Sequence, residues 1–254
     1  MTSTSKGRGL WPRLAALCFW VLLWALAAFI TGKGLILPSP AAVVSALIRL
    51  GRTSAFWISA GLSLLRIACG FLAGALIGIA LAALTSVSKL ARTLLAPAIR
   101  VVRATPVASF IILVLLWTTR ALVTGVIAAL MVIPVVWGQL SAAIESVDPG
   151  LLELARVYRF GRWKTFRLVY LPSVLPQLSA ACLTAQGFAW KSGVAAEVLC
   201  LPRNSIGTQL YYAKLYLNTD DLFAWTLTVI LLSFLLEALC RLGFARLGNW
   251  RARA

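Results

Sequence analysis

Long runs of apolar residues, each flanked by basic or polar residues, recur along this chain of 254 residues. A helix needs about 20 mostly apolar residues to cross the hydrocarbon core of a bilayer. Hydrophobic residues make up 61% of the chain and charged residues only 12%, whereas soluble domains carry about 25% charged residues. These proportions exclude a soluble enzyme, a disordered segment and a disulfide-rich secreted module. We predict an all-α integral membrane protein.

Six apolar runs predict six membrane-spanning helices in one transmembrane domain of residues 14–240. The runs cover residues 14–30, about 62–84, about 107–118, about 121–137, about 174–196 and about 222–240. The first run follows an N-terminal tail of residues 1–13. A cleavable signal peptide is an alternative for that run, because Ala25-Leu26-Ala27 resembles a cleavage site. The length of the run and its two tryptophans favour a retained span.

The segments between the runs predict how neighbouring helices pack. In the second run Gly61, Gly70, Gly74 and Gly78 recur about every four residues, a spacing that lets another helix approach closely. Only Thr119-Arg120 separates the third and fourth runs, so we expect two antiparallel neighbours. Ser39 and Pro40 suit the start of a short interfacial helix over residues 41–50. Residues 201–221 read as a polar loop whose tyrosines lie at the membrane boundary.

The charge of the chain is strongly unbalanced, with 24 Lys and Arg against 7 Asp and Glu. Sixteen of the basic residues fall in four segments that share one side of the predicted topology. These segments are the N-terminal tail, residues 89–103, residues 156–167 and a C-terminal tail of residues 241–254. Because basic residues accumulate on the cytoplasmic side, we expect both termini to be cytosolic, in a bacterial cytoplasmic (inner) membrane. Topology thus explains the charge without a nucleic-acid partner.

Residue types that support chemistry are scarce. The chain has no histidine, and histidine is the commonest general base and metal ligand. The five cysteines are scattered and suit small buried apolar positions. We therefore expect neither catalytic residues nor a metal site.

The most informative segment covers residues 145–172. Asp148 and Pro149 predict a helix start, and an apolar pattern follows on a charged segment until Gly161 breaks it. A second basic amphipathic helix over about 162–170 runs toward Pro172. Two interpretations stay open at this point: a helix pair lying on anionic lipid, or a docking element for a cytosolic partner.

This segment resembles the coupling loop, or EAA motif, of ABC importer permeases of the binding-protein-dependent type. Glu153-Leu154-Ala155 matches the head of the motif, and Leu171-Pro172 matches its tail at the same spacing, with Val169 at the hydrophobic position. The glycine of the motif falls on Arg159, with Gly161 two residues later. The motifs at 37–40, 63–66 and 147–149 resemble the nitrate/sulfonate/taurine branch, so the resemblance covers roughly residues 35–240.

The resemblance implies a six-span type I ABC importer permease fold with cytosolic coupling helices. It implies a second permease copy, as a homodimer in membrane lipid, two ATPase subunits that use ATP and Mg, and an extracytoplasmic binding protein. That protein would deliver a small anionic or zwitterionic solute. The chain has no phosphate-binding loop, so we expect no bound cofactor and no ATP hydrolysis here. The ATPase contact would involve Glu153, Ala155, Arg156, Arg159, Gly161, Leu171 and Pro172.

Charged residues inside predicted spans are candidates for contact with a solute. Arg66, Lys191 and Glu197 fall at a similar depth near the outer ends of the second and fifth spans. The further pathway candidates are Gln186, Trp190 and Ser192. Alternatively, Arg66 extends to lipid headgroups and Glu197 pairs with Lys191 or Arg66 across helices.

Two other functions compete with the permease. A secondary transporter or channel for a small solute is the main alternative, although the halves of the sequence show no clear internal repeat. A membrane enzyme would need a nucleophile with its base, or metal ligands.

Overall fold

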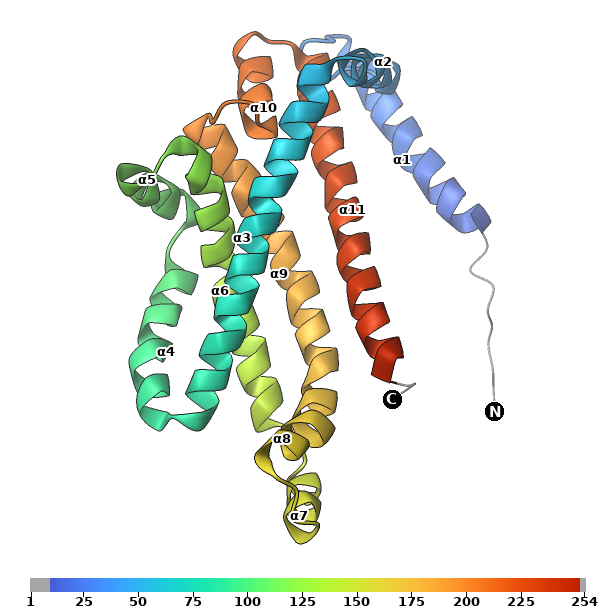
Figure 1. Ribbon diagram of the computed structural model, residues 1–254. Coiled ribbons are helices and arrows are strands. Elements are labelled where there is room, and N and C mark those ends of the chain that lie inside the picture. The colour runs from blue at the N-terminus through green and yellow to red at the C-terminus, as the bar shows by residue number, and fades with distance from the viewer. Residues whose placement is uncertain (1–9, 252–254) are drawn as a thin grey trace.

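The computed structural model describes residues 10–251, and all described secondary structure is helical. Residues 1–9 and 252–254, which belong to the two expected cytosolic tails, lie outside the described residues. Figure 1 shows an elongated bundle with α2 and α10 at its upper end and α7 and α8 at its lower end. The helices are α1 (Leu10–Thr31), α2 (Pro40–Gly51), α3 (Ser54–Val87), α4 (Lys89–Ala104), α5 (Val107–Trp117), α6 (Arg120–Glu145), α7 (Pro149–Val157), α8 (Arg162–Thr165), the π-helix η1 (Phe166–Tyr170), α9 (Leu171–Cys200), α10 (Ile206–Leu215) and α11 (Thr219–Arg251).

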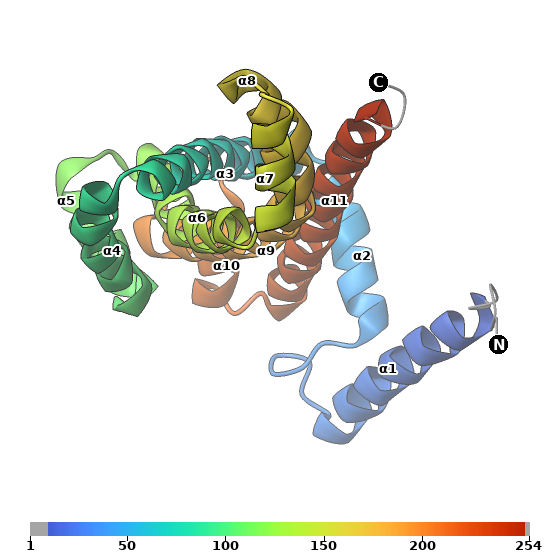
Figure 2. The same ribbon diagram turned by 90° about the horizontal axis from the view of Figure 1, so that it is seen from below.

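The long helices α3, α6 and α9 form the centre of the bundle, and α11 lies beside α9 (Figures 1 and 2). Three of the four predicted packing glycines face α6. A β-carbon on Gly70 would lie 2.3 Å from the carbonyl oxygen of Gly125, and Gly74 and Gly78 also closely approach α6. Gly61 has open space instead. The predicted close helix approach is confirmed for the other three, because only glycine lets these backbones touch.

The third predicted span is not a straight crossing helix. Five helices are long and apolar enough to cross a membrane, and a sixth crossing requires α4 and α5 as one span bent by 108°. In Figure 1, α5 lies crosswise to the long helices rather than antiparallel to α6. Its 11 residues extend about 16 Å, half of the hydrocarbon thickness. Pro106 causes the break because it keeps Thr105 out of the helical conformation.

The upper end carries two short helices. The predicted interfacial helix is confirmed as α2, with Ser39 accepting a hydrogen bond from the backbone N–H of Ala42. Residues 201–221, predicted as a loop, instead contain α10, which is capped by Ser205. That helix packs against α9 and α11, so the chain between the last two spans is part of the helix bundle.

The outer helices also differ from their predicted limits. The last predicted span ends at about residue 240, and α11 continues beyond it to Arg251, so the expected basic tail of residues 241–254 is helical as far as Arg251. The first run forms α1, which diverges from the bundle in Figure 2. It contacts the bundle near its upper end, where Trp24 stacks on Phe223 with 5.9 Å between ring centroids.

Candidate functional site

The segment that resembles a coupling loop, residues 145–172, forms the lower end of the molecule (Figure 1), and we refer to it as the coupling loop. Its first helix is α7, and the predicted start is confirmed, since Asp148 accepts a hydrogen bond from the N–H of Gly150 at 2.8 Å. Ala155 is buried in an apolar cluster with Leu140 and Val169. Ala155 thus belongs to the same apolar cluster as residues at the lower ends of α6 and α9, and α7 contacts η1.

The sequence predicts a bend at Gly161. In the structure the bend after α7 lies at Arg159 instead. Arg159 has φ 49°, the left-handed conformation. The N–H of Phe160 donates to the carbonyl of Ala155 at 2.8 Å, the 6→1 bond of a Schellman helix end. Gly161 has φ −66° and precedes α8. The bend therefore occurs where the family motif has its glycine, although the residue here is arginine.

One face of α7 is covered by the bundle and the other is exposed. Leu152 packs against the apolar cluster around Ala155. On the opposite face Leu154, Val157 and Tyr158 are exposed, with Val157 at 77%. Glu153 and Arg156 are also exposed. These side chains form an apolar stripe bordered by charges.

A cleft of about 660 Å³ separates the coupling loop from the lower ends of the long helices. Ile79 of α3, Leu140 of α6 and Leu178 of α9 line its upper part, and Arg156 and Arg162 lie at its margin. Of the predicted motif residues, Ala155, Arg156 and Leu171 line the cleft, whereas Pro172 is exposed at the start of α9. The loop thus contacts the bundle through few residues and leaves most of its surface uncovered.

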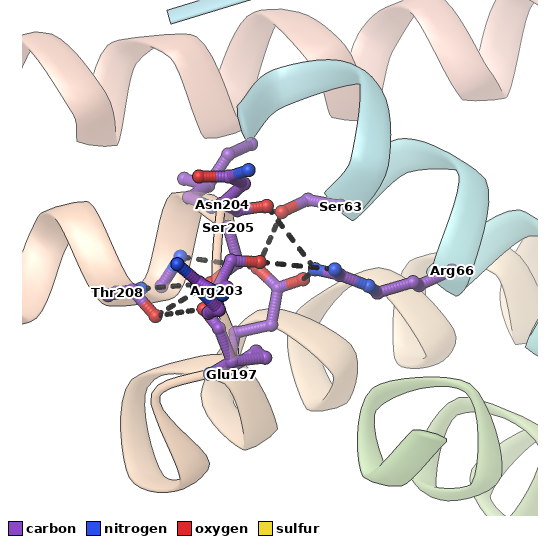
Figure 3. A network of polar contacts seen from close by, with 10 residues as sticks. Ser63, Arg66, Glu197, Arg203, Asn204, Ser205 and Thr208 are labelled. Carbon is purple, nitrogen blue, oxygen red and sulfur yellow. Dashed lines mark hydrogen bonds and ion pairs between the residues drawn. The ribbon is translucent and has the colours of Figure 1, made fainter. Parts of the chain in front are cut away.

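At the opposite end, a buried carboxylate joins three helices (Figure 3). The side chain of Glu197 in α9 is 0% exposed. Its Oε2 accepts hydrogen bonds from Ser63 Oγ of α3 at 2.7 Å and from the N–H of Gly207 in α10 at 3.2 Å. Ser63 Oγ in turn accepts from the N–H of Ile206 at 2.9 Å. Glu197 and Ser63 therefore bind N–H groups at the start of α10, where a helix lacks internal partners and favours negative charge.

Arg66 completes this arrangement, which we call the upper polar cluster: Ser63, Arg66, Glu197 and the backbone of residues 203–207. The Arg66 guanidinium lies 3.8 Å from Glu197 Oε1. It donates to the carbonyls of Arg203 and Asn204 at 3.1 and 3.3 Å (Figure 3). The structure thus pairs Arg66 with Glu197 across helices, as the ion-pair alternative requires.

The other pathway candidates lie on different faces of α9. Lys191 is exposed, on the same face as Phe188 and Leu199. Gln186, Trp190 and Ser192 are buried inside the chain. The Trp190 indole N–H donates to the carbonyl of Val229 at 3.1 Å, and Ser192 Oγ donates to the carbonyl of Ala189 at 3.3 Å. Lys191 therefore shares no surface with these three, and it is separate from the upper polar cluster.

The sequence interpretation missed two exposed helical arginines, Arg100 and Arg103, because it assigned residues 89–103 to a cytosolic loop. Arg100 and Arg103 lie in the C-terminal half of α4, a helix that contacts α3 and α6. The spacing of the basic residues was the available signal, since all of them fall on one face of a helix.

Comparisons with known proteins agree on the type of chain. The family model described as "Binding-protein-dependent transport system inner membrane component" matches residues 74–248. The taurine transport system permease protein of Escherichia coli (strain K12) is 26% identical over 89% of this chain and 84% of its own length. The Bacillus subtilis (strain 168) permease protein named for aliphatic sulfonates transport is 27% identical, with 85% and 78% covered.

Two further matches extend this comparison. The nitrate import permease protein of Leptolyngbya laminosa is 31% identical over 57% of this chain and 52% of its own length. A crystal structure described as an amino acid ABC transporter with histidines aligns with a TM-score of 0.54 at 19% identity. That alignment covers 84% of this chain and 94% of the solved chain, and it shows a shared fold.

Proposed function

Because this chain belongs to the family of binding-protein-dependent transport system inner membrane components, we propose that it forms the membrane pathway of an ATP-driven importer. It is a permease subunit with an all-helical type I fold. In this proposal a second copy of the chain completes the pathway as a homodimer. An extracytoplasmic binding protein delivers the solute, and two ATPase subunits bind from the cytosol.

The uncovered surface of α7 is the observation that carries the coupling role. Leu154, Val157 and Tyr158 form an apolar stripe on a short helix that projects from the lower end of the bundle. An apolar helix face of this kind fits a complementary groove on a partner. Glu153 and Arg156 border the stripe and offer charge-assisted hydrogen bonds to that partner. Arg159 and Gly161 would contact the ATPase beyond the helix, while Leu171 and Pro172 connect the loop to α9.

The coupling role fixes the orientation that we propose. With the ATPase on the lower side, the start of α1 and the end of α11 point toward the cytosol of a bacterium, and α2 and α10 lie at the outer face of the inner membrane. The sequence has no glycine-rich loop ending in Lys-Ser or Lys-Thr, so the ATPase subunits would use ATP and Mg²⁺. The permease itself then needs neither a catalytic residue nor a cofactor.

The relatives indicate the class of solute. Their names refer to taurine, aliphatic sulfonates and nitrate, which carry a sulfonate or nitrate group. We propose a small anionic or zwitterionic solute of this chemistry. Lys191, exposed on α9, supplies a positive charge toward the proposed pathway, whereas Arg66 and Glu197 mainly neutralise each other.

Charge reversal on α7 tests the coupling role. We expect Glu153→Lys to release the ATPase subunit during purification of the complex, because it places a second positive charge beside Arg156 at the proposed contact. Asp220→Lys makes the same charge change at an exposed position at the upper end and should leave the complex intact. An ATPase that stays bound to the Glu153→Lys variant, or that leaves both variants, would contradict docking through α7.

A further inference from the structure

Basic residues form a ladder along one face of α4. At about 100° per residue, Lys89, Arg92, Arg100 and Arg103 all fall within a sector of about 80° on the helix. Exposed apolar residues Leu90, Leu94 and Val101 fall together on another face, about 80–120° away from Arg100. The apolar face of α4 is therefore suited to contact with lipid tails, and the basic face is not.

Contacts with α6 fix the height of this ladder in the bundle. At its lower end Arg92 forms an ion pair with Glu145, the last residue of α6. Arg103 lies 11 residues further along, a rise of about 16 Å. A β-carbon on Gly138 of α6 would lie 4.0 Å from Arg103 Nη1. Gly138 is seven residues from the lower end of α6, which is a rise of about 10 Å. The Arg103 guanidinium therefore lies beside α6 about 10 Å above its lower end, in the lower third of that 26-residue helix.

Arg100 and Arg103 differ from Arg66 in the groups that surround them. Arg66 has a carboxylate and two carbonyls as partners. Arg100 and Arg103 are exposed, and within residues 10–251 neither has a carboxylate within ion-pair distance. Charged groups at membrane depth are costly and normally face a partner or a water-filled cavity. The described residues of the chain thus supply no counter-charge to these two arginines.

We propose that Arg100 and Arg103 form an anion-binding step inside the membrane, where they bind the sulfonate or nitrate group of the solute on its way to the cytosol. This inference rests on the proposed function. A guanidinium presents planar, paired N–H donors that match the oxygens of such a group. Arg92, the next basic position below, already has Glu145 as its partner and is not part of the proposed site.

The test uses the complete transporter in liposomes, with its ATPase and binding protein, and measures uptake of taurine, ethanesulfonate and nitrate. For the imported probe, we expect the Arg100→Gln, Arg103→Gln double variant to lower the uptake rate about tenfold or more, because charge-assisted hydrogen bonds are lost. ATP hydrolysis stimulated by the binding protein should persist, which shows that the complex is folded and coupled. Arg103→Lys keeps the charge but not the paired donors, and should give an intermediate rate.

Two controls distinguish solute binding from a general loss of positive charge and from binding of lipid. Arg52→Gln removes one exposed positive charge at the upper end and should not change uptake. A phosphate headgroup has the same chemistry as the solute, so each variant is measured in phosphatidylcholine vesicles with and without phosphatidylglycerol. A defect that requires phosphatidylglycerol would overturn the solute-binding role in favour of lipid.

Unchanged uptake in the double variant would overturn the site alone. A wild-type transporter that hydrolyses ATP but imports none of the probes would overturn the proposed solute class, and this inference with it.

Discussion

The upper polar cluster and the coupling loop are two charged regions at opposite ends of the same helices, and they satisfy their polar groups in different ways. In the cluster, Glu197 is completely buried and meets Ser63, Gly207 and Arg66 within the chain. In the loop, Glu153 and Arg156 are exposed beside uncovered apolar side chains. Burial costs free energy unless polar groups are paired. Glu197 Oε2 accepts two hydrogen bonds, whereas Oε1 accepts none and has only the Arg66 guanidinium 3.8 Å away as its counter-charge. The charged and apolar side chains of the loop are exposed instead, and the proposed partner would cover them.

From this contrast we expect the largest loss of stability when Glu197 is replaced. Glu197→Leu removes the acceptor for two hydrogen bonds and leaves the Arg66 guanidinium without its counter-charge, at a cost of about 3–5 kcal/mol in the free energy of unfolding. Glu197→Gln keeps an acceptor for Ser63 and should lose less. Thermal unfolding of the chain in detergent checks both variants. Equal stability of Glu197→Leu and wild type would show that the cluster does not hold the upper end together.

The next effect is steric and falls at the start of α10. A β-carbon on Gly207 would lie 2.3 Å from the β-carbon of Glu197 and 2.5 Å from the nitrogen of Val198. Gly207→Ala should therefore lower the free energy of unfolding by about 1–3 kcal/mol. Gly187→Ala is the matched control, since Gly187 has nothing within 4 Å. The two variants should differ clearly in midpoint temperature, and similar midpoints would contradict the tight packing of α10 on α9.

A smaller effect, of opposite sign, is expected at the bend of the coupling loop. Arg159 adopts the left-handed conformation, which costs a residue with a side chain about 1–2 kcal/mol and costs glycine little. Arg159→Gly should raise the unfolding midpoint of the chain. Gly161→Ala should leave it unchanged, because Gly161 has an ordinary φ of −66° and open space around it. The reverse result would place the bend at Gly161.

The smallest effect on stability is expected on the exposed face of α7. Leu154 is 52% exposed, so Leu154→Ser should change the free energy of unfolding by no more than about 0.5 kcal/mol. ATPase binding should nevertheless weaken. Leu152 lies on the covered face, and Leu152→Ser should lower the midpoint temperature. If Leu154→Ser destabilises the isolated chain as much as Leu152→Ser, the two faces of α7 are not distinct in the way the comparison requires.

Hydropathy and glycine spacing predicted most of the bundle. The apolar runs located α3, α6, α9 and α11, and the glycines at 70, 74 and 78 identified the face of α3 that meets α6. The short apolar run of α5 was ambiguous, because 11 apolar residues fit either part of a span or a helix lying across the bundle. The amphipathic α4 was assigned to a loop, because its charges lowered the hydropathy of the segment.

The parts of the site that depend on distant contacts were less accessible to sequence. The pairing of Arg66 with Glu197 was among the alternatives, but the role of Ser63 needs α10 to fold back beside α3. Nothing in the local residues predicts that return. The left-handed conformation of Arg159 could not be predicted from the sequence either. Such a conformation is expected at glycine, and the nearest glycine lies two residues away.

The glycine contact between α3 and α6 has a mechanical consequence. The backbones of α3 and α6 touch without intervening side chains, so a change of side-chain rotamers cannot let one helix slide along the other. We therefore expect α3 and α6 to move as one rigid pair, which we call the strut. This strut starts beside the coupling loop, which follows α6 directly, and reaches Ser63 and Arg66 near the upper end. A shift of α7 by a partner would therefore tilt the upper polar cluster as one body with the strut, and the loop would act on the far side of the membrane without any bond breaking between them.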